Sequence, residues 1–175
     1  MLAALRSSSY QGVVLRTATK NDSELLYQVF LDSRIDLMLG ITGWEQQQQD
    51  AFMHFQFNTQ LDQYQKNYVD ARFDVIVAEG NVIGNIYTAQ TDGAIHLVDI
   101  SLLPEQRNRG IGQALIQDLL DEATRIQKDV TLHVQQGNPA IHLYLRLGFF
   151  ETGEQGIYKR MEWLPSSART TKTIP

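Results

Sequence analysis

The spacing of hydrophobic and polar residues changes several times along the chain, and each spacing predicts a different element. Apolar and polar side chains alternate over residues 13–19, and several of them are β-branched, which predicts a strand. Thr19 and Asp22 then match a capping box, and the apolar positions that follow predict a helix over residues 21–31. Residues 32–43 contain two glycines, which indicate an irregular connection or a broken helix.

Glutamines dominate the next segment, but its apolar residues recur at the spacing of a helix. These residues are Met53, Phe57, Leu61, Tyr64 and Tyr68. Intervals of three and four residues predict an amphipathic helix whose glutamines face the solvent. Such a stripe usually belongs to a core. An aromatic wall of a substrate site is the alternative that the pattern leaves open.

From Phe73 the spacing is that of strands. The stretch 73–79 predicts a strand, Gly80-Asn81 a two-residue hairpin turn, and residues 82–90 the partner strand. After a second turn, residues 94–104 predict a third strand that ends at a proline. Three such strands in succession predict an antiparallel meander.

Helices and strands alternate in the rest of the chain. The first is a predicted helix, whose inner face carries Ile111, Leu115, Leu119 and Ile126. A strand over residues 130–135 precedes a short helix that has Asn138 as N-cap and Pro139 as first residue, and that ends before Gly148. Residues 149–151 and 156–163 predict two final strands.

The order β-α-α-β-β-β-α-β-α-β-β predicts one mixed α/β domain over residues 1–164. Helices flank a central mixed, mostly antiparallel sheet. We expect a polar, disordered tail over residues 165–175. The strand 156–163 could pair with a second copy through a sheet edge, which would make a homodimer.

Composition narrows the function classes. The 175 residues carry a net charge of −5, which disfavours a nucleic-acid partner. The absence of cysteine excludes disulfides, thiolate zinc sites and an acyl-enzyme on sulfur. The four histidines lack metal-ligand spacing, so we expect no metal. With no long apolar run and no signal-peptide pattern, we expect no membrane partner and a cytoplasmic location.

The stretch "QRNRGIGQAL", residues 106–115, places two glycines and two arginines directly before a helix. Free N–H groups at a helix N-terminus, bare glycine backbone and arginine charge together favour an anion, above all a diphosphate. The Gly-Lys-Ser/Thr end of a P-loop is absent. The third glycine and the acidic residue of a dinucleotide-binding fingerprint are absent too. A tight turn of purely structural role is the plain alternative.

Two segments together resemble the GNAT superfamily of acyl-CoA-dependent N-acetyltransferases. The first is Arg107-Asn108-Arg109-Gly110-Ile111-Gly112, and the second is "NPAIHLYLRLGF", residues 138–149. The order of elements is also that of the family. The resemblance implies direct transfer of an acetyl or longer acyl group from acetyl-CoA, the cosubstrate, to a primary amine in a ternary complex. A non-catalytic CoA-binding regulatory or interaction module on the same fold is the alternative.

The resemblance also implies where CoA binds. The pyrophosphate would lie on backbone N–H groups of residues 109–113, and the pantetheine arm would pair with the backbone of residues 100–102. Asn138 would contact the arm while it caps its helix. The cofactor-binding positions implied in this way are Ile100, Leu102, Arg107, Arg109, Gly110, Ile111, Gly112, Gln113 and Asn138.

Two residues are the catalytic candidates. Tyr144 matches the family's general acid, although it also lies on the inner stripe of its helix. Asp99 is the candidate general base, acting through water, and His96, Glu79 and His133 are its rivals. In a regular strand His96 and Asp99 point to opposite sides.

The family resemblance places the amine acceptor among residues 34–44, the aromatic helix through Tyr68, Tyr87, and residues 152–158. The acidic chain suits a polyamine, an aminoglycoside or lysine, whereas the aromatic residues suit an aryl amine or a hydrophobic amino acid. A protein N-terminus is a further alternative.

Overall fold

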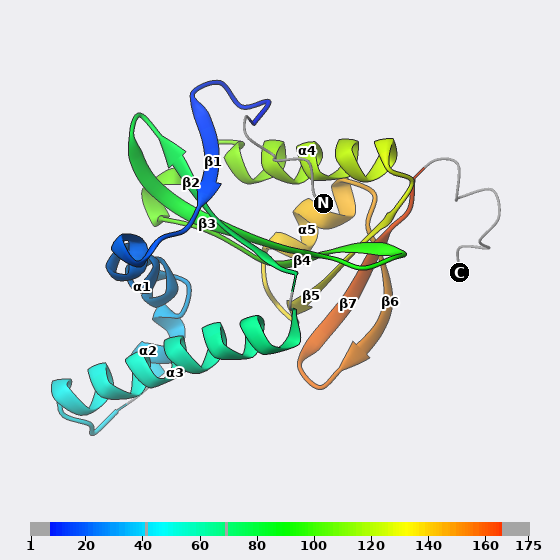
Figure 1. Cartoon of the computed structure of the whole chain (residues 1–175). Coiled ribbons are helices and arrows are strands. Elements are labelled where there is room, and N and C mark those ends of the chain that lie inside the picture. Colours follow the sequence, from blue (N-terminus) through cyan, green and yellow to red (C-terminus); the bar gives the residue numbers. More distant parts are fainter. Residues whose placement is uncertain (1–7, 41, 69, 166–175) are drawn as a thin grey trace.

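A single seven-stranded sheet organises the chain, with helices on both faces (Figure 1). The computed structural model describes residues 8–40, 42–68 and 70–165, except the side chains of residues 36, 37 and 39. The strands are β1 (Val13–Thr17), β2 (Arg72–Ala78), β3 (Asn81–Gln90), β4 (Ala94–Leu102), β5 (Asp129–Gln135), β6 (Phe150–Gln155) and β7 (Tyr158–Trp163). The helices are α1 (Ser23–Asp32), α2 (Ile35–Gly40), α3 (Gln46–Asn67), α4 (Ile111–Arg125) and α5 (Ala140–Arg146), with 3-10 turns η1 (Lys20–Asp22) and η2 (Pro104–Gln106).

The sheet has the order β1-β2-β3-β4-β5-β7-β6, and every pair is antiparallel except β4–β5. The mixed, mostly antiparallel architecture predicted from the sequence is therefore confirmed. Within the predicted irregular segment, a turn at residues 33–34 separates α1 from the short helix α2, which corresponds to the broken helix that was expected. The predicted tail lies outside the described residues except for Pro165, which is buried.

Two expectations about sheet edges and turns were wrong. The turn between β2 and β3 is Glu79-Gly80, whose φ angles are 51° and 80°, because Asn81 already pairs with Ala78. The segment 156–163 does not form an edge. Strand β6 continues to Gln155 and covers the outer side of β7, so β6 and β1 are the edges of the sheet.

Each face of the sheet has its own core. On one face α4 and α5 pack through buried residues such as Leu115, Leu119 and Tyr144 (Figure 1). On the other face α1 and α3 pack through Phe30 and Phe57 among others. The stripe predicted for α3 faces inward, since Met53 and Phe57 are buried, Leu61, Tyr64 and Tyr68 are half-buried, and the glutamines are mostly exposed.

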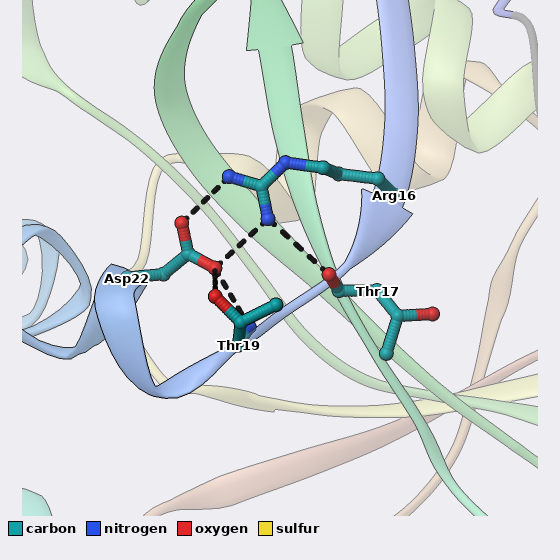
Figure 2. Close-up of polar contacts among 4 residues, drawn as sticks. All are labelled: Arg16, Thr17, Thr19 and Asp22. Atoms are coloured by element: carbon teal, nitrogen blue, oxygen red, sulfur yellow. Dashed lines mark hydrogen bonds and ion pairs between the residues drawn. The ribbon is translucent and has the colours of Figure 1, made fainter.

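An ion pair joins β1 to the start of α1 (Figure 2). Arg16 donates from Nη1 to Asp22 Oδ2 at 2.8 Å and from Nη2 to Oδ1 at 2.6 Å. The Thr19 backbone N–H and hydroxyl donate to the same Oδ2 at 2.7 and 2.9 Å. The hydrogen bond from Arg16 is the main reason that the pKa of Asp22 lies far below its usual range. The predicted capping box of Thr19 and Asp22 is present, but it caps η1 rather than α1, and Arg16 pairs with the same carboxylate.

The parallel pair β4–β5 is short. Pairing runs from Ala94 opposite Asp129 to Leu97 opposite Leu132 and stops there. Strand β4 nevertheless continues to Leu102, so the two strands separate toward one end. Among the described residues, no helix is both long enough and apolar enough to cross a membrane.

Candidate active site

The glycine–arginine loop forms the turn from η2 into α4. Gly110 is the N-cap of α4 with φ of 85°, and Asn108 is also left-handed at 58°. The first helical hydrogen bond runs from Ala114 N–H to the Gly110 carbonyl. The preceding N–H groups of the first turn therefore have no partner within the helix. This is the geometry that favours an anion.

The two arginines of this loop have different contacts. Arg107 donates from Nε to the carbonyl of Leu102 at 2.8 Å, so it is fastened to the end of β4. Arg109 donates from Nη1 to Gln106 Oε1 at 2.9 Å, within the loop itself. Both side chains are exposed, and both add positive charge beside the helix N-terminus.

The candidate pantetheine site lies where β4 and β5 separate. Ile100 and Leu102 pack their side chains against the core shared with α4, while their strand is no longer paired with β5. Asn138 lies in the connection from β5 into α5, and its Oδ1 accepts the N–H of Ala140 at 2.9 Å. A strand edge without a partner, next to an anion-binding turn, fits an extended ligand with a diphosphate at one end.

A pocket opens on the other face of β4, between α1, α3 and β3. Its lining residues are Leu26, Phe30, Ser33, Arg34, Phe57, Gln60, Leu61, Tyr64, Asn85, Tyr87, Asp99 and Ser101. Of the four candidate bases, Asp99 is the one that lines it. The other three do not line it: His96 is on the same strand, His133 is on β5 and Glu79 is in a turn.

Asp99 retains some exposure to the pocket, yet protein atoms surround its carboxyl. Burial raises the pKa of Asp99, while the hydrogen bond from Asn85 and the charge of Arg34 oppose the rise. Asn85 Nδ2 donates to Asp99 Oδ2 at 2.5 Å. A carboxylate whose pKa is raised is a stronger base near neutral pH.

A bulge in β4 changes which residues share a face. The pairing of β4 with β3 skips Val98. Beyond this point the alternation reverses, so His96 and Asp99 both face α3. The ring of His96 is 6.1 Å from that of Tyr68, and Asp99 lines the pocket with Tyr64, one helical turn away. The expectation of opposite sides was wrong because it assumed a regular strand.

The rival bases have other surroundings. His96 Nδ1 is hydrogen-bonded to the hydroxyl of Thr131, and burial lowers the pKa of His96. Burial and the charge of Arg160 lower the pKa of His133, which lies opposite Arg160 on β7. Glu79 lies in the β2–β3 turn.

Tyr144 is buried on α5, with its ring 5.6 Å from that of Phe149 in an edge-to-face contact. Burial raises the pKa of Tyr144, and the charge of Asp99 raises it further. The Tyr144 side chain therefore packs in the core, as its place on the inner stripe of the helix predicts. Its raised pKa also keeps the hydroxyl protonated, so that it could donate the proton.

The structure adds pocket residues that the sequence did not single out. Asn85, Gln60 and Ser101 were missed. A signal for Asn85 existed, since it is a polar residue at a buried position in a strand of apolar residues. Trp44 and the β6–β7 turn, expected near the acceptor, do not line this pocket.

A family model described as the acetyltransferase (GNAT) family matches residues 41–149, which is more than half of the chain. The protein belongs to this family, which confirms the resemblance found in the sequence. Acetyl-CoA is the cosubstrate of the family. The protein is therefore an acetyltransferase by family. No curated protein matches the chain.

Solved structures share the fold at low sequence identity. PaiA N-acetyltransferase from Thermoplasma acidophilum, in complex with coenzyme A, has 20% identity and a TM-score of 0.65 over 87% of this chain and 98% of that one. Spermidine N-acetyltransferase from Vibrio cholerae, in complex with CoA and spermine, has 24% identity and a TM-score of 0.61 over 89% and 96%. Ard1 from Thermoplasma volcanium has 18% identity and a TM-score of 0.60 over 88% and 98%. In the part of the chain that the structure describes, no cluster of three or more His, Cys, Asp or Glu residues could hold a metal ion.

Proposed function

We propose that the protein transfers an acetyl group from acetyl-CoA to the primary amine of a small molecule or peptide, by direct attack in a ternary complex. One observation carries this proposal. The end of β4 that does not pair with β5 lies beside the glycine–arginine turn at the start of α4, and the same strand carries Asp99 into a pocket on its other face. One strand thus connects a site for the cosubstrate with a site for an acceptor.

The residues proposed to hold the cosubstrate are those of the turn and the strand. The N–H groups of Ile111, Gly112 and Gln113, with the charges of Arg107 and Arg109, suit the diphosphate. The backbone of residues 100–102 and Asn138 suit the arm. When bound, acetyl-CoA supplies a thioester whose carbonyl carbon accepts a nucleophile.

Asp99 and Tyr144 would move the two protons of the reaction. Asp99, directly or through water, takes a proton from the acceptor ammonium, so that nitrogen can form a bond to the acetyl carbon. As the carbon–sulfur bond breaks, Tyr144 gives its proton to sulfur, and the second proton that the nitrogen loses in forming the amide restores the Tyr144 hydroxyl. Amine and thioester become amide and free thiol. The charge of Asp99 that raises the pKa of Tyr144 supports the two groups being close enough to act together.

Calorimetric titration with acetyl-CoA tests the proposal, with dephospho-CoA and NAD as controls. We expect saturable binding of acetyl-CoA and release of free thiol when an amine is added. Binding with no thiol release for any amine would favour the non-catalytic CoA-binding module. No binding would remove the enzyme proposal.

Tyr144→Phe separates binding from chemistry. We expect acetyl-CoA to bind as in the wild type, while turnover falls by about 10²-fold, the usual contribution of a general acid. The ring and its contact with Phe149 are kept, so loss of folding should not confuse the result. Unchanged turnover would mean that Tyr144 is a packing residue alone.

A further inference from the structure

The acceptor pocket holds one cation, Arg34, among its lining residues. Its guanidinium carbon lies 4.1 Å from the centre of the Phe30 ring, and Nη1 donates to Ser33 Oγ at 3.0 Å. Stacking on Phe30 thus orients the side chain. Its charge also acts on Asp99, another lining residue, whose pKa it lowers against the effect of burial.

The charges of the lining residues suggest what kind of amine can enter. Asp99 and Arg34 are the ionisable pair of opposite sign, and the other lining residues are neutral at pH 7. A polyamine carries a second ammonium, which would meet Arg34 instead of a second carboxylate. An acceptor with an amine and a carboxylate satisfies both residues, with its nitrogen toward Asp99 and its carboxylate on the guanidinium.

The walls indicate the rest of the acceptor. Leu26, Phe57 and Leu61 form an apolar part of the lining, and the rest is largely polar. The apolar part stabilises an apolar side chain by removing its surface from water.

We infer that the acceptor is an amino acid with a free carboxylate and an apolar side chain, and that Arg34 determines this specificity. The inference rests on the proposed acetyl transfer. Arg34 holds the carboxylate, so the amine is directed at Asp99. Acetylation then joins the acceptor nitrogen to the acetyl carbon, with loss of one proton to Asp99 and release of the thiol.

Paired acceptors test this inference. Initial rates of thiol release would be measured for apolar L-amino acids such as leucine and phenylalanine. Each would be compared with its carboxamide and with its decarboxylated amine. Spermidine would be tested as a further acceptor. A charge-assisted hydrogen bond is worth about 1.5–3 kcal/mol, so kcat/KM should be roughly 10–100-fold higher for the free acid.

Variants assign the preference to one residue. Arg34→Gln should remove most of the preference, so that kcat/KM for the acid falls toward that for the decarboxylated amine. The ratio of the two rates within each enzyme is compared, because loss of the Arg34 charge also raises the pKa of Asp99. Arg34→Lys should keep part of it, since the charge remains without the bidentate fork. Arg125→Gln is the matched control, because Arg125 lies on exposed α4 surface and pairs with Glu122 outside the pocket.

The outcomes separate this inference from the proposed function. Acetyl-CoA binding and transfer to carboxamides, plain amines or spermidine as readily as to the free acids would overturn the amino-acid acceptor alone. An acid preference that Arg34→Gln leaves intact would overturn the role of Arg34. Absence of acetyl-CoA binding, or of transfer to every acceptor, would overturn both proposals.

Discussion

At the scale of single residues, Asp99 shows how neighbouring groups set the strength of a candidate base. Burial disfavours its charged form, whereas the amide of Asn85 and the charge of Arg34 favour it. The balance leaves the pKa of Asp99 raised. The carboxyl then ionises at a higher pH than an exposed aspartate, whose pKa is about 3.9. Activity should accordingly rise with pH as Asp99 loses its proton.

Asn85→Ala tests this balance. Without the donated hydrogen bond the carboxylate loses stabilisation, so the acidic limb of the kcat/KM profile should move upward by roughly one pH unit. The acceptor titrates identically with both enzymes, so the difference between the profiles isolates the enzyme group. Asn81→Ala, in an exposed position on the same strand, is the control. An unmoved limb would argue against Asp99 as the base.

Asp22 is the opposite case, because its pKa is lowered by the hydrogen bond from Arg16. Its stabilising contribution is fully present above the unfolded pKa of about 3.9 and is lost as pH falls below it. Asp22→Asn should therefore lower the free energy of unfolding at pH 7 by about 1–3 kcal/mol. This range allows for solvent screening of the ion pair, because Arg16 is half-exposed.

Denaturant unfolding at several pH values measures this effect. The gap between wild type and Asp22→Asn should narrow as the pH falls below about 4. Asp121→Asn, which alters an exposed carboxylate that accepts a hydrogen bond from Gln117, should change stability far less. A gap that is independent of pH would show that the ion pair is not its source.

At the scale of elements, the turn before α4 depends on glycine for two reasons. Gly110 has a left-handed φ of 85°, which a side chain disfavours, and it leaves the backbone open beside the free N–H groups. Gly110→Glu should abolish saturable binding of acetyl-CoA in calorimetry, through strain, bulk and repulsion of the diphosphate. Gly156→Glu, at a left-handed glycine of the β6–β7 turn, is the matched control and should bind. Equal binding by both variants would refute the loop assignment.

At the scale of the whole molecule, the sequence predicted the elements well because each depends on local spacing. The stripe of α3 and the meander of β2, β3 and β4 could be seen without knowing what packs against them. The bulge at Val98 could not, because it is defined by pairing with another strand. Arg34 was expected near the acceptor from the family resemblance, and it does line the pocket, but its contacts there depend on how α1 and α3 pack over β4. The glycine–arginine turn was recognisable because its chemistry is contiguous in the chain.

The short β4–β5 pairing makes the sheet two halves joined by a seam. One half holds β1 to β4 and the other holds β5, β7 and β6, with four residue pairs between them. A ligand that hydrogen-bonds to β4 and contacts Asn138 beyond β5 would bridge the seam. Its binding would then stabilise the association of the two halves of the sheet. At 100 times its dissociation constant, such a ligand adds about 2.7 kcal/mol to stability. Acetyl-CoA should therefore slow amide hydrogen exchange in both halves together, and protection confined to the α4 turn would show that it does not bridge the seam.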